Sequence, residues 1–234
     1  MEFSKISAPT LKELFVSNLE SMILSGQLPV GTQLPPEREL AASMQVSRAV
    51  VNAGINELAR KGYLVVRPRV GTFVADYRRY GTIETFLSII SYNGGRLRLD
   101  EVRSILELRQ ALDTLAINLC AEHITDAELK KLRESTEAIG QAGSPEEAVG
   151  HAFAFQHQLA FFSGNSLLPV IFSSFKSLTR TLWLRFCSLY GIQMLYENTD
   201  ALCSYLEQRD FSGAIQCLTQ TLENSIYGDK QIYY

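Results

Sequence analysis

Arg48 and Asn52 are the residues whose type and spacing point most directly to a chemistry. They lie four positions apart in an amphipathic stretch, so on a helix their side chains project from one face. In the major groove of DNA, Arg can bond guanine through two hydrogen bonds, and Asn can bond adenine in the same way. Ser47 precedes them as a favourable N-cap, and the free N–H groups of such a helix start can face a phosphate.

The elements expected around these residues form a helix-turn-helix followed by a hairpin. Apolar spacing predicts a helix over 10–25, a short helix over about 37–44 and a third over about 47–61, with a tight turn between the last two. Residues 63–67 and 71–74 are rich in β-branched and aromatic types and flank a Pro-Arg-Val-Gly turn, which predicts two paired strands. Arg38 on the preceding helix and Arg69 at the hairpin tip would contact phosphates or the minor groove. The alternative is that each is an ordinary solvated surface charge.

The net charge of the 234-residue chain is −3, which taken alone argues against a nucleic-acid partner. The charge is unevenly divided, however. Residues 1–79 hold 10 Lys and Arg against 7 Asp and Glu, whereas residues 80–234 hold 12 against 18. A basic module joined to an acidic one is therefore predicted.

Several function classes find no support in the sequence. No apolar run approaches the roughly 20 residues that a membrane helix needs, and the start MEFSKISAPTLKELF lacks a signal-peptide pattern. We therefore expect a cytoplasmic protein with no membrane association. No Walker, HExxH, GxSxG or dinucleotide motif is found, so no enzyme is expected. The scattered cysteines are interpreted as core residues in a reducing compartment: Cys120, Cys187, Cys203 and Cys217.

The predicted fold class is mostly α, with two domains. A winged helix-turn-helix domain is expected over 1–75 and a polar linker over 76–81. An all-helical bundle of six to seven helices is expected over 82–234, where strand signals are almost absent. The helices expected in it lie near 82–93, 99–123, 126–141, 145–162, 166–190, 192–208 and 211–227.

Five short motifs between Ile23 and Val74 follow one another in a characteristic order and spacing. They are G-Q-L-x-x-G-x-x-L-P at 26–35, E-R-E-L-A at 37–41, V-S-R at 46–48, L-A-R-K-G-Y at 58–63 and G-T-F-V at 71–74. This stretch closely resembles the winged-helix domain of the GntR family of bacterial transcription regulators. The resemblance implies a homodimer bound to double-stranded operator DNA. The predicted DNA contacts are Arg38, Ser47, Arg48, Asn52, Arg69 and Gly71.

Two departures from the family pattern bear on the operator and on the fold. Asn52 stands where the family commonly has a second Arg, and Ala53-Gly54 replaces the usual Glu-Ala. A Gly inside a helix costs about 1 kcal/mol relative to Ala. Pro36 replaces the usual capping Ser, which removes a side-chain cap and keeps a rigid start. The operator is therefore expected to differ from the family's commonest one.

The second half resembles the FCD effector domain of the FadR-type branch. The matching pieces are L-R-x-x-L-D at 108–113, F-x-x-x-L-A-x-x-S-G-N at 155–165 and R-D-x-x-x-A at 209–214. Many members hold a divalent metal through an Asp and three His. The matching positions here are Ala152, Gln156, Thr199 and Thr221, with Asp113 as a possible earlier acid. We therefore expect no metal and no cofactor.

A metal-free cavity would hold its effector through other groups, and the resemblance implies a small organic acid or an acyl-CoA-like molecule. Arginines would bind the anion and aromatic side chains would form an apolar wall. Ion pairs and ordinary core packing are the alternative roles for the same residues. A fixed repressor without ligand response, or less readily a helical enzyme, stays open. The candidate ligand contacts are Arg109, Asp113, Phe155, Gln156, Arg180 and Trp183.

Overall fold

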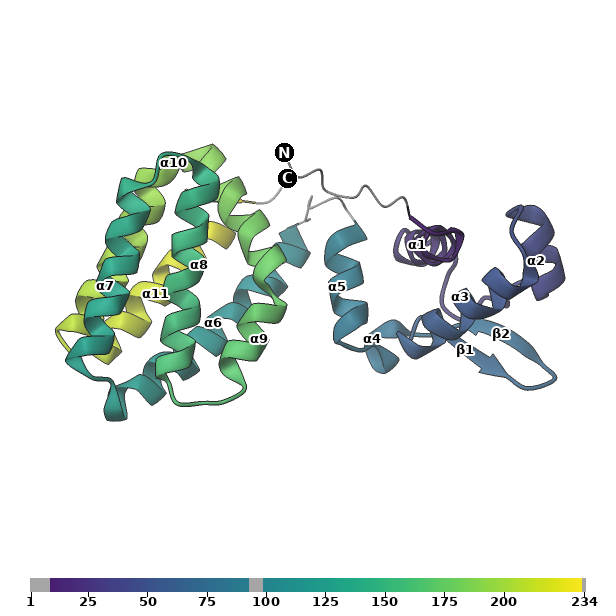
Figure 1. Ribbon diagram of the computed structural model, residues 1–234, viewed down its shortest axis with the longest axis horizontal. Coiled ribbons are helices and arrows are strands. Elements are labelled where there is room, and N and C mark those ends of the chain that lie inside the picture. The colour runs from purple at the N-terminus through teal and green to yellow at the C-terminus, as the bar shows by residue number, and fades with distance from the viewer. Residues whose placement is uncertain (1–8, 93–98, 233–234) are drawn as a thin grey trace, which may run out of the picture. The chain divides into compact units, whose positions relative to one another are not determined.

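The computed structural model describes residues 9–92 and 99–232 and is mostly helical (Figure 1). The chain divides into two compact units, Met1–Gly94 and Gly95–Tyr234. The first contains a helix-turn-helix and a two-stranded hairpin, and the described part of the second contains helices only. The predicted fold class is therefore confirmed.

The first unit begins with three helices, α1 (Leu11–Leu24), α2 (Glu37–Ser43) and α3 (Arg48–Arg60). Thr10 and Glu13 form a capping box at the start of α1, and the Ser47 hydroxyl accepts the Val50 N–H at the start of α3. The antiparallel strands β1 (Leu64–Arg67) and β2 (Gly71–Val74) follow, with Leu64 opposite Val74 and Arg67 opposite Gly71. These elements match the expected winged helix-turn-helix.

The core of this unit lies between α1, α3 and the hairpin. Val51, Ile55 and Leu58 point inward from α3, as their spacing predicts. Gly54 lies on the same buried face, against the ring of Phe15 from α1. An added Cβ at Gly54 would meet that ring at 2.3 Å. The glycine that looked costly in a helix is therefore required for the close packing of α1 on α3.

The region after the hairpin differs from the expected linker and domain boundary. A short helix α4 (Tyr77–Tyr80) occupies the segment expected to be a linker, and α5 (Ile83–Tyr92) packs on α1. The boundary between the compact units therefore falls at 94–95, whereas the sequence suggested 75–82. The physical reason is that Thr85 is buried in α5 and its hydroxyl donates to the Lys61 carbonyl, while the Tyr63 hydroxyl donates to the Thr85 carbonyl at 3.3 Å.

The described part of the second unit is a bundle of six helices (Figure 1). The predicted helix 166–190 is interrupted at Phe175, where α9 ends and α10 begins. Gly191, with φ of 81°, breaks α10 at the point where the sequence predicted two helices. No helix in the described ranges is both long and apolar enough to cross a membrane. The helices are α6 (Leu99–His123), α7 (Asp126–Gln141), α8 (Pro145–Phe162), α9 (Leu168–Ser174), α10 (Lys176–Glu207) and α11 (Phe211–Ile226).

Gly54→Ala tests the packing of α1 on α3. Ala is the better helix former by about 1 kcal/mol, but its methyl group would collide with the buried Phe15 ring. We expect the free energy of unfolding to fall by about 1–3 kcal/mol, measured by urea denaturation. Gly150→Ala in α8 is the control, because an added Cβ there meets nothing within 4 Å. A Gly54→Ala variant as stable as wild type would contradict this packing.

Candidate DNA-binding surface and effector cavity

The exposed face of α3 carries the residues predicted to read DNA. Arg48, Asn52 and Asn56 follow one another at intervals of four and are all exposed, whereas Val51 and Leu58 on the opposite face are buried. The Ser47 cap fixes the start of the helix at Arg48 and leaves free N–H groups of the first turn available to an anion. This face can enter a major groove without disturbing the core.

Positive side chains flank this face on α2 and on the hairpin. Arg38 and Arg69 are exposed, and the tip of the hairpin and α2 lie at the same end of the unit (Figure 1). Arg69 has φ of 64° and Gly71 has φ of 141°, so the turn depends on left-handed backbone. Gln33 stabilises this turn because its Nε2 donates a hydrogen bond to the Val70 carbonyl at 3.0 Å. Within the described ranges, Arg38, Arg48 and Arg69 have no ion-pair partner.

Asn52 takes part in contacts that the sequence did not reveal. Its Nδ2 donates to Glu37 Oε1 at 3.2 Å, and its Oδ1 accepts from Asn56 Nδ2 at 3.1 Å. The spacing of Arg48, Asn52 and Asn56 could have indicated Asn56. Glu37 could not be found in this way, because it comes from another helix.

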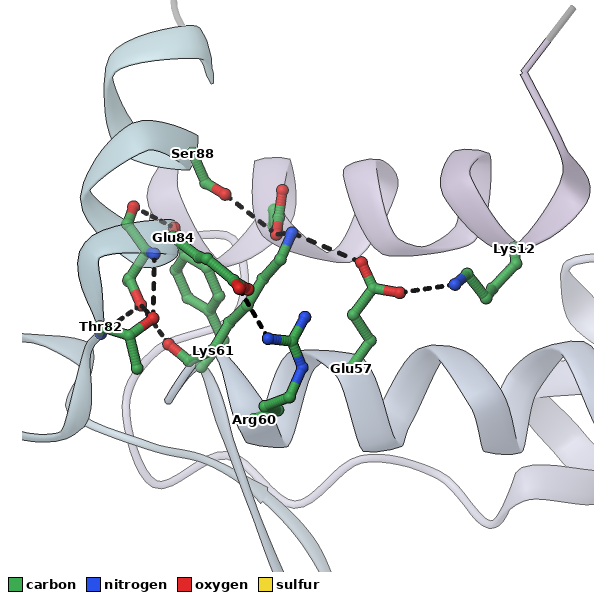
Figure 2. A network of polar contacts seen from close by, with 10 residues as sticks. Lys12, Glu57, Arg60, Lys61, Thr82, Glu84 and Ser88 are labelled. Carbon is green, nitrogen blue, oxygen red and sulfur yellow. Dashed lines mark hydrogen bonds and ion pairs between the residues drawn. The ribbon is translucent and has the colours of Figure 1, made fainter. Parts of the chain in front are cut away.

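The other end of α3 is fixed to α1 and α5 by a polar network, which Figure 2 shows. Arg60 pairs with Glu84 of α5 at 2.6 Å, and Lys61 pairs with Glu20 of α1 at 2.8 Å. Ser88 of α5 donates to the same Glu20 carboxylate at 3.3 Å. Since Lys61 and Glu20 are largely buried, this pair is less screened by salt than a surface pair.

Two further contacts strengthen this junction. Lys12 of α1 pairs with Glu57 of α3 at 2.8 Å, and this contact lowers the pKa of Glu57 (Figure 2). Gly62, with φ of 77°, lets the backbone approach so closely that an added Cβ would lie 2.1 Å from the Tyr80 carbonyl oxygen. The C-terminal end of α3 and the residue after it are therefore also in close contact with α1 and α4.

The helical unit contains a cavity of about 70 Å³, enclosed mainly by α6, α8, α10 and α11. This is room for a few water molecules or a small ligand. Most of its wall is apolar, and polar side chains enter it from all four helices. The lining residues that bear on its chemistry are Arg109, Asp113, Ala152, Phe155, Gln156, Trp183, Asn198, Thr199, Thr221 and Ser225.

A buried polar cluster lies in the cavity wall. Asp113 is 3% exposed and accepts from Arg109 Nε at 3.1 Å and from Gln156 Nε2 at 3.0 Å to each carboxylate oxygen. The Arg109 guanidinium also lies 4.7 Å above the Trp183 ring. Burial raises the pKa of Asp113, although Arg109 and Gln156 oppose that shift. Asp113 and Arg109 thus place one ionisable acid and one cation in the same wall of the cavity.

Gln156 Oε1 is the unusual atom of this cluster. It is buried and has no hydrogen-bond partner among the residues that the structure describes. An unpaired buried acceptor costs about 1–3 kcal/mol, so an occupant of the cavity that donates a hydrogen bond would be stabilised there. The cavity therefore contains an acceptor to which a bound molecule could donate a hydrogen bond.

The structure brings together five of the six predicted ligand contacts. Arg109, Asp113, Phe155, Gln156 and Trp183 line the cavity. Arg180, on α10, is not among its lining residues. The sequence did not single out the contributions of Asn198 and Ser225. Their part in binding a ligand is still a prediction.

The same cavity contains every position that the FadR-type pattern assigns to metal ligands. Those positions carry an aliphatic side chain, an amide and two hydroxyls, together with the Asp113 carboxylate. Divalent metals in proteins prefer His, Cys and several carboxylates, and Asp113 is already bonded to Arg109 and Gln156. In the described part of the chain, no group of three or more His, Cys, Asp or Glu is placed to hold a metal. The donor set does not fit a metal.

A capped, exposed recognition helix with a wing, followed by a helical unit with an internal cavity, defines a two-domain DNA-binding transcription regulator. Sequence profiles agree with this class. Residues 12–74 match the profile of bacterial regulatory proteins of the gntR family, and residues 104–224 match the FCD domain. The chain belongs to the GntR family and carries an FCD domain.

Relatives of known sequence are similar over most of this chain. The HTH-type transcriptional regulator LutR of Bacillus subtilis is 28% identical over 189 residues, which cover 77% of this chain and 84% of LutR. The HTH-type transcriptional repressor NanR of Shigella sonnei is 29% identical over 171 residues, or 69% of this chain and 61% of NanR. Both are named as transcription regulators.

Solved structures support the fold. Lar of Listeria monocytogenes, which controls expression of the agr system in that organism, aligns with a TM-score of 0.62 and 16% identity. The alignment covers 95% of this chain and 98% of Lar. At this level of identity the likeness concerns the fold alone.

Asp113→Asn keeps the size of the side chain and removes its titration. The raised pKa means that the folded chain holds this proton more tightly than the unfolded chain, where the usual value is 3.8. The stability contributed by the carboxyl is therefore largest at low pH and is lost as the pH rises through the folded-state pKa. We expect the free energy of unfolding of wild type, relative to the variant, to fall as the pH rises above the unfolded-state value of 3.8 in urea titrations. A constant difference would contradict the raised pKa.

Proposed function

We propose that the protein is a homodimeric regulator that binds a two-fold operator and changes its DNA affinity when a small organic acid enters the helical domain. The observation that carries the DNA-binding part is the exposed, capped start of α3, where Arg48 has no acidic partner in the described ranges. Arg38, Ser47, Asn52, Arg69 and Gly71 would complete the contacts with bases and phosphates.

The low charge of one winged unit supports the proposal of a dimer. Residues 1–79 carry a net charge of only +3, and DNA affinity depends on the number of phosphates neutralised. Two copies double that number and place two recognition helices about one helical turn of DNA apart. The helical domain is acidic and would add no attraction to the duplex. Such a regulator would act in the cytoplasm.

The proposal that an effector binds in the helical domain is based on the cavity. Arg109 supplies a cation beside it, and Gln156 Oε1 requires a hydrogen-bond donor. A space of about 70 Å³ suits a small acid better than the much larger acyl-CoA. A fixed repressor without ligand response is the second candidate, because waters could also satisfy the Gln156 amide oxygen.

Coupling between ligand and DNA would pass through α5. This helix is fixed to α1 and to the end of α3 by the network of Figure 2. It is also the last described element before the helical unit in the sequence. A ligand can change DNA affinity only if it favours one arrangement of these elements over another.

Arg48→Ala tests the recognition helix. Loss of a bidentate base contact should weaken binding to an operator selected from random duplexes by about 1–3 kcal/mol and relax base choice at one position, measured by fluorescence anisotropy. Arg103→Ala in α6 is the matched control, because it removes an exposed arginine of the other unit and should leave affinity unchanged. Binding should also weaken steeply as salt rises. Unchanged affinity of Arg48→Ala, or salt-independent binding, would refute the assigned surface.

Ala152→Val tests the effector cavity by filling part of it. In a thermal-shift screen, we expect a small organic acid to raise the melting temperature of wild type and to change operator affinity, and acyl-CoAs to have no effect. The variant should lose this response. Ala154→Val, on the same helix but outside the lining residues, should keep it. Stabilisation by acyl-CoAs alone, or an equal response in both variants, would contradict the proposed effector site.

A further inference from the structure

We propose that Glu37 and Asn56 are positioning residues that orient the Asn52 carboxamide, so that α3 selects adenine at one position of the operator. The inference rests on the proposed DNA-binding function. It adds two residues to the DNA-binding surface, Glu37 from α2 and Asn56 from the third turn of α3. Both are expected to affect base preference, which can be measured.

The geometry places Asn52 between two partners. Glu37 Oε1 accepts from Asn52 Nδ2 at 3.2 Å, and Asn56 Nδ2 donates to Asn52 Oδ1 at 3.1 Å. Asn52 and Asn56 are exposed and Glu37 is half-buried, so the chain of contacts lies on the surface beside Arg48. Asn52 lies one helical turn beyond Arg48 on the same face, so a groove that Arg48 enters also brings a neighbouring base within reach of Asn52.

These contacts fix which way the amide points. An ionised carboxylate only accepts hydrogen bonds, so the nitrogen of Asn52, and not its oxygen, must face Glu37. Asn56 stabilises the same orientation because its amide nitrogen faces the Asn52 oxygen. Without Glu37, the carboxamide could rotate by 180° and exchange its donor and acceptor.

Asn52 keeps enough bonding capacity for a base. Its amide has two N–H donors and an oxygen with two lone pairs. Glu37 uses one donor and Asn56 uses one lone pair, so one donor and one acceptor are left. Adenine offers the complementary pair in the major groove, an acceptor at N7 and a donor at N6.

A purely electrostatic role for Glu37 predicts a different result. A carboxylate near the duplex repels phosphates, so its removal would tighten binding to every sequence by a similar factor. A positioning role predicts in addition that discrimination between bases is lost. The two roles are therefore separated by the ratio of affinities for different bases, and not by affinity itself.

The experiment uses the full chain and duplexes selected by it from a randomised pool. Dissociation constants are measured for the selected site and for its single-base variants. At the position read by Asn52, wild type should prefer adenine by about ten- to a hundred-fold. Glu37→Ala should bind all duplexes somewhat more tightly and reduce this preference to less than about threefold. Asn56→Ala should reduce the preference in part.

Glu39→Ala is the matched control. It removes the same charge from the first turn of the same helix, about 200° around the helix axis from Glu37. It should tighten binding and leave the adenine preference intact. Asn52→Ala should abolish the preference, and adding Glu37→Ala to it should then change no ratio between bases. Melting temperatures of the variants check that each one is folded.

Two results would overturn the inference. Glu37 does not position Asn52 if the Glu37→Ala variant keeps the adenine preference of wild type. The same conclusion follows if Glu37→Ala and Glu39→Ala reduce that preference equally. If Asn52→Ala alters no base preference, Asn52 does not read a base. Failure of the full chain to enrich any sequence would overturn the proposed function itself, which distinguishes the two failures.

Discussion

The close packing of α1 on α3 at Gly54 is the constraint on which the DNA-binding surface depends. The absence of a Cβ allows the Phe15 ring to lie directly against the backbone of α3. This contact, with Val51 and Leu58 beside it, decides which side of the helix is buried. The opposite side, which bears Arg48 and Asn52, is exposed as a consequence.

The same helix is held at its two ends by different kinds of interaction. At its start, Ser47 caps the backbone and Glu37 bonds the Asn52 side chain, and both contacts are exposed. At its end, Lys61 and Glu20 form a largely buried pair, and α5 is attached through Glu84 and Ser88 (Figure 2). Exposed contacts can exchange with DNA at little cost, whereas the buried pair keeps α1, α3 and α5 together as one body.

In the helical unit, a buried polar cluster forms part of the cavity wall. Asp113 accepts hydrogen bonds from Arg109 and Gln156, and Gln156 Oε1 has no partner in the described part of the chain. A buried polar group without its hydrogen bonds is costly. The cavity therefore favours a small polar occupant, and selectivity would come from hydrogen bonds and charge.

The sequence by itself determined the class of fold, the helix-turn-helix with its wing and the exposed position of Arg48, because helix periodicity and capping are local properties of the chain. The resemblance to the FCD domain also indicated five of the residues that line the cavity. Only the tertiary structure decided that α5 packs with the first unit, that Arg180 lies off the cavity and that Glu37 meets Asn52. Each of these depends on how separate helices pack, and spacing along one helix carries no information about a partner 15 or more residues away.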